Sequence, residues 1–430
     1  MTTAAHRMIP VARLRFFAVA CFALSIGGAT GGCRGGGSDT LGLPDAYLLL
    51  APARDKDGHA IRSARGLPLV QPVALDDPRA VPFHKMFGLG FGAELLRTDY
   101  LLKQFLRESS EAGKRFPPAV RASAAEPTVF ILGSGPPLAG RGLATSGFFG
   151  GATDRPGVAW IALPDSPDSD PALAQTVSAR LGQSIAATLA AAGAAEAGPT
   201  PPGGGVPAGL SGSTGPLPVL VAGYASAMEV IAREWRVGDG PLGTLALDAG
   251  TTAQRDLFAA VRQNRFVTTD AGGGRPQLRS AEEMLADPGV AATVLYRMAQ
   301  SKRIGHRVAP VDLYAPFVTE RVPNGISPAA VLGPFRNFQA KLIAVWGRAV
   351  LRGSPPRDIA GLVEAYAAAL PAERSEAIRL FVVTTYGATV KPDGVSPAAD
   401  ATGALAELTA LAAEVTAGRR PLRPALNAGK

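Results

Sequence analysis

The feature of this sequence that most constrains its fold is a change in the spacing of apolar residues along its 430 positions. Short β-type apolar runs occur as far as about residue 163, whereas helical spacing dominates after about residue 250. Strands are expected at 47–50, 128–132 and 158–163, and helices at 93–111, 171–192, 218–235, 252–264, 280–300 (interrupted at Pro288), 328–352, 358–369, 372–385 and 397–416. The sequence therefore predicts an α+β N-terminal half with a small mixed sheet, followed by an all-α C-terminal half.

The N-terminus has the pattern of an export signal. Arg7, Arg13 and Arg15 precede the apolar run 16–26, and small residues then lead to Cys33. A run of about eleven apolar residues is too short to span a bilayer and is typical of a cleaved signal peptide. The segment before Cys33 resembles the bacterial lipobox, in which this cysteine is diacylated and becomes the mature N-terminus. Residue 30 is a threonine where that motif usually has an aliphatic residue, so secretion after residue 29 or 31 is the alternative.

These observations predict a signal peptide at 1–32, a lipid tether at 33–44 and a protein anchored to a membrane of the cell envelope through Cys33. The alternative location is secreted or periplasmic. The net charge of +8 includes three arginines of the signal, and the remaining charges of both signs are interspersed. Nucleic-acid binding needs a stripe of one sign, so no nucleic-acid partner is expected.

Composition also limits the chemistry. With four histidines and two cysteines, the chain has little material for a metal site or a disulfide scaffold, and we expect neither a metal nor a cofactor. No G-x-S-x-G or S-x-x-K motif is present. The segment Asp55-Lys56-Asp57-Gly58 begins like a calcium loop but lacks glycine and glutamate at the later positions, which predicts a turn.

Two predicted helices, on either side of a Gly/Pro-rich loop at 193–217, carry the most informative pattern. The first contains Gln175-Thr176-Val177-Ser178-Ala179-Arg180-Leu181-Gly182-Gln183-Ser184, and the second contains Ala222-Gly223-Tyr224-Ala225-Ser226-Ala227-Met228-Glu229. The pair resembles the gluzincin zinc peptidases, in which one helix carries H-E-x-x-H and the next carries a glutamate ligand in E-G-[FYL]-A-x-Y-x-E. Histidines at i and i+4 share one helix face and bind one zinc, and the adjacent glutamate activates the bound water.

The chain keeps the residues that surround these two motifs, here called the gluzincin frame, but it lacks the zinc ligands and the general base. Ala179 and Gln183 stand at the histidine positions, Arg180 at the general base and Ala222 at the third ligand. A fixed positive charge beside a zinc ion would cost on the order of several kcal/mol even at an effective dielectric near 20. The resemblance also implies that the strand at 158–163 is an edge strand that binds the backbone of a substrate.

Helical geometry is compatible with this frame. Apolar residues recur every four positions at Leu173, Val177, Leu181, Ile185 and Leu189, which predicts a buried stripe. At 100° per residue, Ala179 and Gln183 face away from that stripe, towards a cleft in the resembled fold or towards solvent in an ordinary amphipathic helix.

The resemblance implies a zincin-like body at 45–250 with active-site-type helices, followed by a helical domain at 251–430. We expect an inactive pseudo-peptidase with a binding or scaffolding role and an extended peptide or a protein as its partner. Cleft contacts are expected at Arg180, Gln183, Tyr224 and Glu229. Two alternatives remain open: a hydrolase of unrecognised chemistry, with Glu229, Asp165 or His306 in catalytic roles, and a purely structural envelope lipoprotein.

Overall fold

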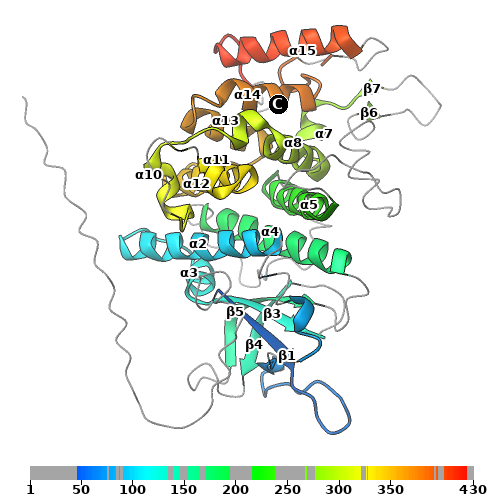
Figure 1. Cartoon of the computed structure of the whole chain (residues 1–430), viewed down its shortest axis with the longest axis vertical. Helices are drawn as coiled ribbons and strands as arrows, with labels where there is room; N and C mark the ends of the chain where they lie inside the picture. Colours follow the sequence, from blue (N-terminus) through cyan, green and yellow to red (C-terminus); the bar gives the residue numbers. More distant parts are fainter. Residues whose placement is uncertain are drawn as a thin grey trace, which may run out of the picture. The chain divides into compact units, whose positions relative to one another are not determined.

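A computed structural model describes residues 46–74, 77–83, 87, 91–133, 139–145, 154–163, 170–193, 216–237, 267–268, 277–320, 326, 328–391, 394–395 and 401–423 (Figure 1). The chain consists of two units, residues 1–34 and 35–430, and all described residues belong to the second. The expected signal peptide, Cys33 and its tether, most of the Gly/Pro loop at 193–217 that was expected to be mobile, the helix at 252–264 and the boundary at 250 lie outside the described residues.

The strands are β1 (Tyr47–Pro52), β2 (Leu69–Pro72), β3 (Thr128–Leu132), β4 (Ala139–Thr145), β5 (Asp154–Leu163), β6 (Val267–Thr268) and β7 (Gln277–Leu278). The helices are α2 (Phe91–Glu111), α3 (Pro118–Ala125), α4 (Asp170–Gly193), α5 (Pro216–Val237), α7 (Ala281–Leu285), α8 (Pro288–Gln300), α9 (Lys302–Gly305), α10 (Val311–Tyr314), the 3₁₀ helix η4 (Ala315–Phe317), α11 (Pro328–Leu332), α12 (Pro334–Leu351), α13 (Ile359–Ala369), α14 (Arg374–Thr384) and α15 (Ala401–Thr416).

Five strands form one closed, mixed sheet in the order β1-β2-β4-β5-β3, with β3 pairing back to β1. The pairs β1–β3, β3–β5 and β2–β4 are parallel, whereas β1–β2 and β4–β5 are antiparallel. A small mixed sheet near the N-terminus, with helices making up most of the rest, was predicted from the sequence and is confirmed. The expectation of an all-α C-terminal half is wrong in one respect, because the short strands β6 and β7 form a separate antiparallel pair after position 250.

Alternation along the strands separates two hydrophobic cores. One set of alternating residues fills the inside of the closed sheet: Leu50, Val70, Val129, Ile131, Leu143 and Val158, with Leu48 and Trp160 packed against them. Residues on the opposite face, including Phe130, Leu132, Ile161 and Leu163, join the main core shared with the helices. Because successive side chains of a strand point to opposite faces, β1, β3 and β5 contribute to both cores, whereas β2 and β4 contribute Val70 and Leu143 to the core inside the sheet.

The main core is continuous across the helices. Figure 1 shows α2 and α4 next to the sheet, with α5 and α12 on their other side. The same buried cluster reaches from Ala46 to Leu422, so residues from both sides of position 250 pack together. Phe335, Phe338 and Trp346 bring α12 into the centre of this cluster, where all three are almost completely buried.

Local signals explain where several helices begin and end. The predicted interruption at Pro288 is confirmed: α7 ends at Leu285, Asp287 caps α8 by accepting a hydrogen bond from the Gly289 N–H, and Pro288 is its first residue. The helix expected at 328–352 is divided into α11 and α12, because Gly333 has a φ of 79° and Pro334 opens the next helix. The strands β2, β4, β6 and β7, the helices α3, α9 and α10 and the 3₁₀ helix η4 were not predicted.

Candidate functional site

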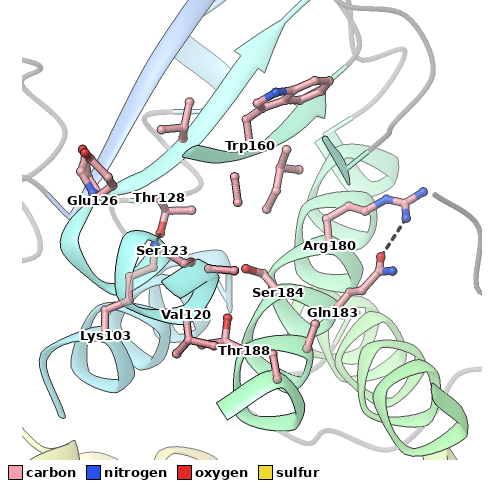
Figure 2. Close-up of a pocket in the computed structure, with 17 residues that line it drawn as sticks. Lys103, Val120, Ser123, Glu126, Thr128, Trp160, Arg180, Gln183, Ser184 and Thr188 are labelled. Atoms are coloured by element: carbon pink, nitrogen blue, oxygen red, sulfur yellow. Dashed lines mark hydrogen bonds between the residues drawn. The ribbon is translucent and has the colours of Figure 1, made fainter. Parts of the chain in front are cut away.

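An open cleft lies between the sheet and two helices (Figure 2). It encloses about 860 Å³ of empty space, a figure that includes solvent at its mouth. Helix α4, the strands β3 and β5, the helix α3 and one side chain of α2 form its walls. Its polar and aromatic lining residues are Lys103, Ser123, Glu126, Thr128, Trp160, Arg180, Gln183, Ser184 and Thr188.

Helix α4 presents one stripe to the cleft and another to the core. Arg180, Gln183, Ser184, Ala187, Thr188 and Ala191 line the cleft, with the i, i+3, i+4, i+7 spacing of a single helix face. The stripe predicted to be buried is confirmed at Val177, Leu181, Ile185 and Leu189, each with an exposed fraction of 0%. The apolar stripe therefore orients α4, and its small and polar residues leave space on the other side.

The expectation that residues 158–163 form an edge strand is wrong. Strand β5 pairs with β3 through Trp160 and Ile161, among other residues, and with β4 through Ala159, Trp160 and Ile161. Both sides of this strand are therefore already hydrogen-bonded, because the sheet closes on itself. A peptide cannot be added to it as a further strand, so a ligand in the cleft contacts side chains of β5.

A buried polar knot lies at one end of the cleft and joins α2 to β3. Lys103 Nζ lies 2.9 Å from Asp99 Oδ2 and donates a 3.0 Å hydrogen bond to Thr128 Oγ1. The Thr128 hydroxyl in turn donates to Asp99 Oδ2 at 2.5 Å. The side chain of Lys103 is 10% exposed and that of Asp99 is 1% exposed. Lys103 and Thr128 line the cleft, whereas Asp99 lies behind them.

Arg180 and Gln183 lie at another part of the cleft, on α4. Arg180 Nη1 donates a 3.0 Å hydrogen bond to Gln183 Oε1, which Figure 2 shows at the side of the cleft away from Lys103. Arg180 also interacts electrostatically with Glu229 of α5. Burial raises the pKa of Glu229 above its ordinary value, and the positive charge of Arg180 opposes this shift only in part.

The cationic side chains line the cleft, whereas most of the carboxylates that accompany them do not. Among the described lining residues, Glu126 is the acidic one, and it forms a 3.1 Å ion pair with Arg155. The carboxylates of Asp99 and Glu229, which accompany Lys103 and Arg180, do not line the cleft. The cleft therefore offers positively charged donors to a ligand.

The structure places the expected site residues in different surroundings. Arg180 and Gln183 line the cleft, but Ala179, Ala222, Tyr224 and Glu229 are not among its described lining residues. Tyr224 is completely buried, bonds to the Gln339 amide and packs edge-on against Trp346 with a ring-centroid distance of 6.3 Å. Helix α5 therefore supports α4 from the core side, and α3 takes the place expected for it at the cleft.

The small residues of the peptidase-like frame have packing roles in this fold. A Cβ atom on Gly182 would lie 3.0 Å from Met228 Cγ and 3.3 Å from Ala225 Cα, so this glycine allows α4 and α5 to approach closely. A Cβ atom on Gly223 would lie 2.5 Å from the Ala291 Cβ of α8. Close helix packing is sufficient to account for both glycines.

Sequence reasoning missed the polar knot of Lys103, Asp99 and Thr128. A usable signal was present: Asp99 falls on the apolar stripe of α2 between Leu95 and Leu102, where a charged residue needs a buried partner. Lys103 follows Asp99 by four positions and is therefore on the same helix face. The partner on β3 is 29 residues from Asp99, and local periodicity does not indicate that contact.

The other candidate metal-ligating and catalytic residues are not among the described residues that line the cleft. Asp55, Asp57 and His59 have ligand atoms within 4.8 Å of one another, but all three are exposed. Asp55 Oδ1 accepts hydrogen bonds from the backbone N–H groups of Asp57 and His59, which confirms the predicted turn. His306 is an exposed residue at the end of α9, and Asp165 lies outside the described residues. No helix in the described part of the chain is long and apolar enough to cross a membrane.

Comparisons with known protein families, curated protein sequences and solved structures found no match to this chain.

Proposed function

We propose that this protein is an exported, lipid-anchored binding protein without peptidase activity, and that its cleft holds an extended peptide through side-chain contacts. One observation carries the proposal: Arg180 and Gln183 form a hydrogen-bonded pair on the cleft-facing stripe of α4, at positions where the gluzincin frame has its general base and second histidine. An arginine–amide pair binds carboxylate and carbonyl oxygens and does not activate water.

The lining of the cleft suits a peptide backbone. Ser123, Ser184 and Thr188 supply hydroxyl groups that both donate and accept hydrogen bonds, as backbone amides require. Small apolar residues of α3 and α4 lie among these hydroxyls in the lining of the cleft (Figure 2). Because β5 has no free edge, affinity depends on these side chains rather than on strand addition.

The features of the cleft favour a binding role over the two alternatives, a hydrolase of unrecognised chemistry and a purely structural lipoprotein. Glu229 and His306 are not among the described lining residues, so the cleft does not bring these catalytic candidates to a ligand. Thr128 as a residue is 4% exposed, and its hydroxyl donates a hydrogen bond to Asp99 and accepts one from Lys103, which leaves the hydroxyl poorly placed as a nucleophile. A defined cleft with charged donors favours a binding role over a purely structural one.

The test is to fill the cleft. Ser184→Trp places a large ring in the centre of the cleft, and Ala368→Trp places the same ring on an exposed position of α13 as the matched control. The probe is a pool of random, N-acetylated tetrapeptides with free C-terminal carboxylates, passed over the immobilised mature protein. We expect wild type and Ala368→Trp to retain a defined subset of the pool and Ser184→Trp to retain none.

A second measurement separates binding from catalysis. The same pool is incubated with the protein in the presence of zinc, and the peptides are analysed by mass spectrometry for cleavage. We expect intact peptides and no stoichiometric zinc by elemental analysis. Peptide cleavage that stops on chelation would contradict the proposal, as would equal peptide retention by wild type and Ser184→Trp.

A further inference from the structure

We propose that the polar knot formed by Lys103, Thr128 and Asp99 is a carboxylate subsite that holds the C-terminal carboxylate of the bound peptide. This inference rests on the proposed function, because it gives a chemical identity to one end of the same ligand. The subsite comes from α2 and β3 and is separate from the gluzincin-like frame on α4 and α5.

The hydrogen-bonding capacity of Lys103 supports the subsite. An ammonium group has three N–H donors, and the contacts of Lys103 Nζ with Asp99 Oδ2 and Thr128 Oγ1 account for two of them. The side chain of Lys103 is only 10% exposed, yet it lines the cleft. A third donor on a nearly buried ammonium gains most from an anionic acceptor, since water has little access to it.

Asp99 makes the ammonium a fixed rather than a mobile charge. It holds Lys103 from behind with Oδ2, while its other oxygen, Oδ1, is buried without a hydrogen-bond partner. A buried carboxylate with an unsatisfied oxygen is costly unless the lysine stays charged beside it. The pair thus presents the positive end of a dipole to the cleft at a position set by α2 and β3.

The geometry favours a chain terminus over a larger anion. One ammonium donor with the hydroxyl of Ser123 lining the same end of the cleft matches the two oxygens of a carboxylate (Figure 2). A phosphate group carries more charge and more acceptor oxygens than this donor set satisfies. A peptide that ends at Lys103 extends along the hydroxyls of α4 towards Arg180 and Gln183.

The experiment compares three pools of N-acetylated random tetrapeptides on the immobilised mature protein. The first has free C-terminal carboxylates, the second is C-terminally amidated, and the third is amidated with glutamate as its last residue. Retained peptides are quantified by mass spectrometry for wild type, Lys103→Met and Thr128→Val. Lys114→Met, which removes an exposed lysine just after α2, is the matched control.

We expect wild type and Lys114→Met to retain the free-carboxylate pool at least about tenfold more than either amidated pool. Lys103→Met should retain the free and amidated pools equally. Thr128→Val keeps the lysine–aspartate pair and almost the same shape, so it should fold and should reduce the preference for the free carboxylate. If circular dichroism shows that Lys103→Met is unfolded, the test of the subsite is the preference of Thr128→Val for the free-carboxylate pool. An unchanged preference would then overturn the subsite.

The outcomes distinguish the two proposals. If wild type retains the free and amidated pools equally and Ser184→Trp abolishes both, peptide binding stands and the carboxylate subsite is wrong. A preference for the glutamate-ended amide over the free carboxylate would assign the subsite to side-chain carboxylates and overturn the chain-end assignment. If no pool binds to wild type, the proposed function fails and the subsite fails with it.

Discussion

Lys103 Nζ of α2 lies 3.0 Å from Thr128 Oγ1 of β3, and this contact links the helical core to the sheet at one end of the cleft. The residues are 25 positions apart, and both are almost buried. The contact fixes the α2 side of the cleft, as the apolar stripe on α4 fixes the opposite wall. The cleft is thus bounded by groups whose positions the core determines.

Close packing of glycines in α4 and α5 predicts a graded loss of stability. Gly223→Ala would bring a Cβ atom to 2.5 Å from Ala291 Cβ and 3.0 Å from the Pro288 carbonyl oxygen, and Gly182→Ala to 3.0 Å from Met228 Cγ. Since overpacking typically costs about 1–3 kcal/mol, we expect both variants to lower the free energy of unfolding in urea, Gly223→Ala by more.

The control for this pair is Gly361→Ala in α13. Its added Cβ would lie 3.4 Å from Asp358 Oδ1, an ordinary contact, and alanine is favoured over glycine in helices by about 1 kcal/mol. We expect Gly361→Ala to be neutral or stabilising. If Gly223→Ala had the same effect, the close approach of α5 and α8 would be wrong.

A fully buried ion pair in the C-terminal helices should be necessary for stability. Lys341 Nζ lies 2.7 Å from Glu373 Oε1 and donates to the Ile304 carbonyl at 2.7 Å, while the Tyr366 hydroxyl donates to Glu373 Oε2. Lys341→Met leaves the Glu373 carboxylate buried without its cation, and removal of one partner of such a pair costs about 3–5 kcal/mol.

The double variant Lys341→Met/Glu373→Gln removes both charges and should recover part of the lost free energy of unfolding, measured by urea denaturation at neutral pH. The difference between single and double variants measures the coupling of the two side chains. A single variant as stable as wild type would contradict the cost expected for leaving Glu373 without its cation.

The partly buried carboxyl of Glu229 predicts a pH dependence with a defined sign. Burial raises its pKa above the ordinary 4.5, so the folded chain holds the proton more tightly than the unfolded chain does. Stability from this group is therefore greatest at low pH and falls as pH rises from about 4.5 through the folded-state pKa. We expect Glu229→Gln to raise the urea midpoint at about pH 7.5, with a smaller effect at about pH 4.

Glu282→Gln, at an exposed position of α7, serves as the control and should leave the midpoint unchanged at both pH values. If Glu229→Gln lowered stability at about pH 7.5, the attraction between Glu229 and Arg180 would outweigh the cost of burial, and the pKa would be shifted in the opposite direction.

The lipobox-like run before Cys33 predicts membrane attachment. Cys33→Ala should prevent uptake of labelled fatty acid and move the protein from the membrane fraction to the soluble fraction, because a diacylated cysteine supplies the anchor. Labelling of wild type is the reference. An unlabelled, soluble wild-type protein would contradict the anchor and favour secretion.

The resemblance to the gluzincin site is tested by introducing the zinc ligands and the general base that this chain lacks. Ala179→His, Arg180→Glu, Gln183→His and Ala222→Glu together supply three zinc ligands and a base on the two packed helices. We expect zinc affinity above that of a triple variant that keeps Ala222, with little hydrolysis, because supporting residues around the ligands are absent. Equal zinc affinities would show that residue 222 does not face residues 179 and 183.

The sequence by itself determined the type of most elements and the buried stripe of α4. Apolar residues such as Val177, Leu181 and Ile185 recur with the period of a helix, and this pattern needs no knowledge of distant contacts. Turn chemistry was equally local, as at Asp55 and Pro288, where hydrogen bonds or ring geometry involve only neighbouring residues.

Tertiary structure alone decided how these elements surround a cleft. Periodicity along β5 does not reveal that β4 covers its second side, and Tyr224 is held in the core by Gln339, which is 115 residues away. Local periodicity likewise does not indicate the contact between Lys103 and Thr128, which are 25 positions apart. The physical reason is that local spacing selects which face of an element is buried, whereas pairing between distant elements selects what that face meets.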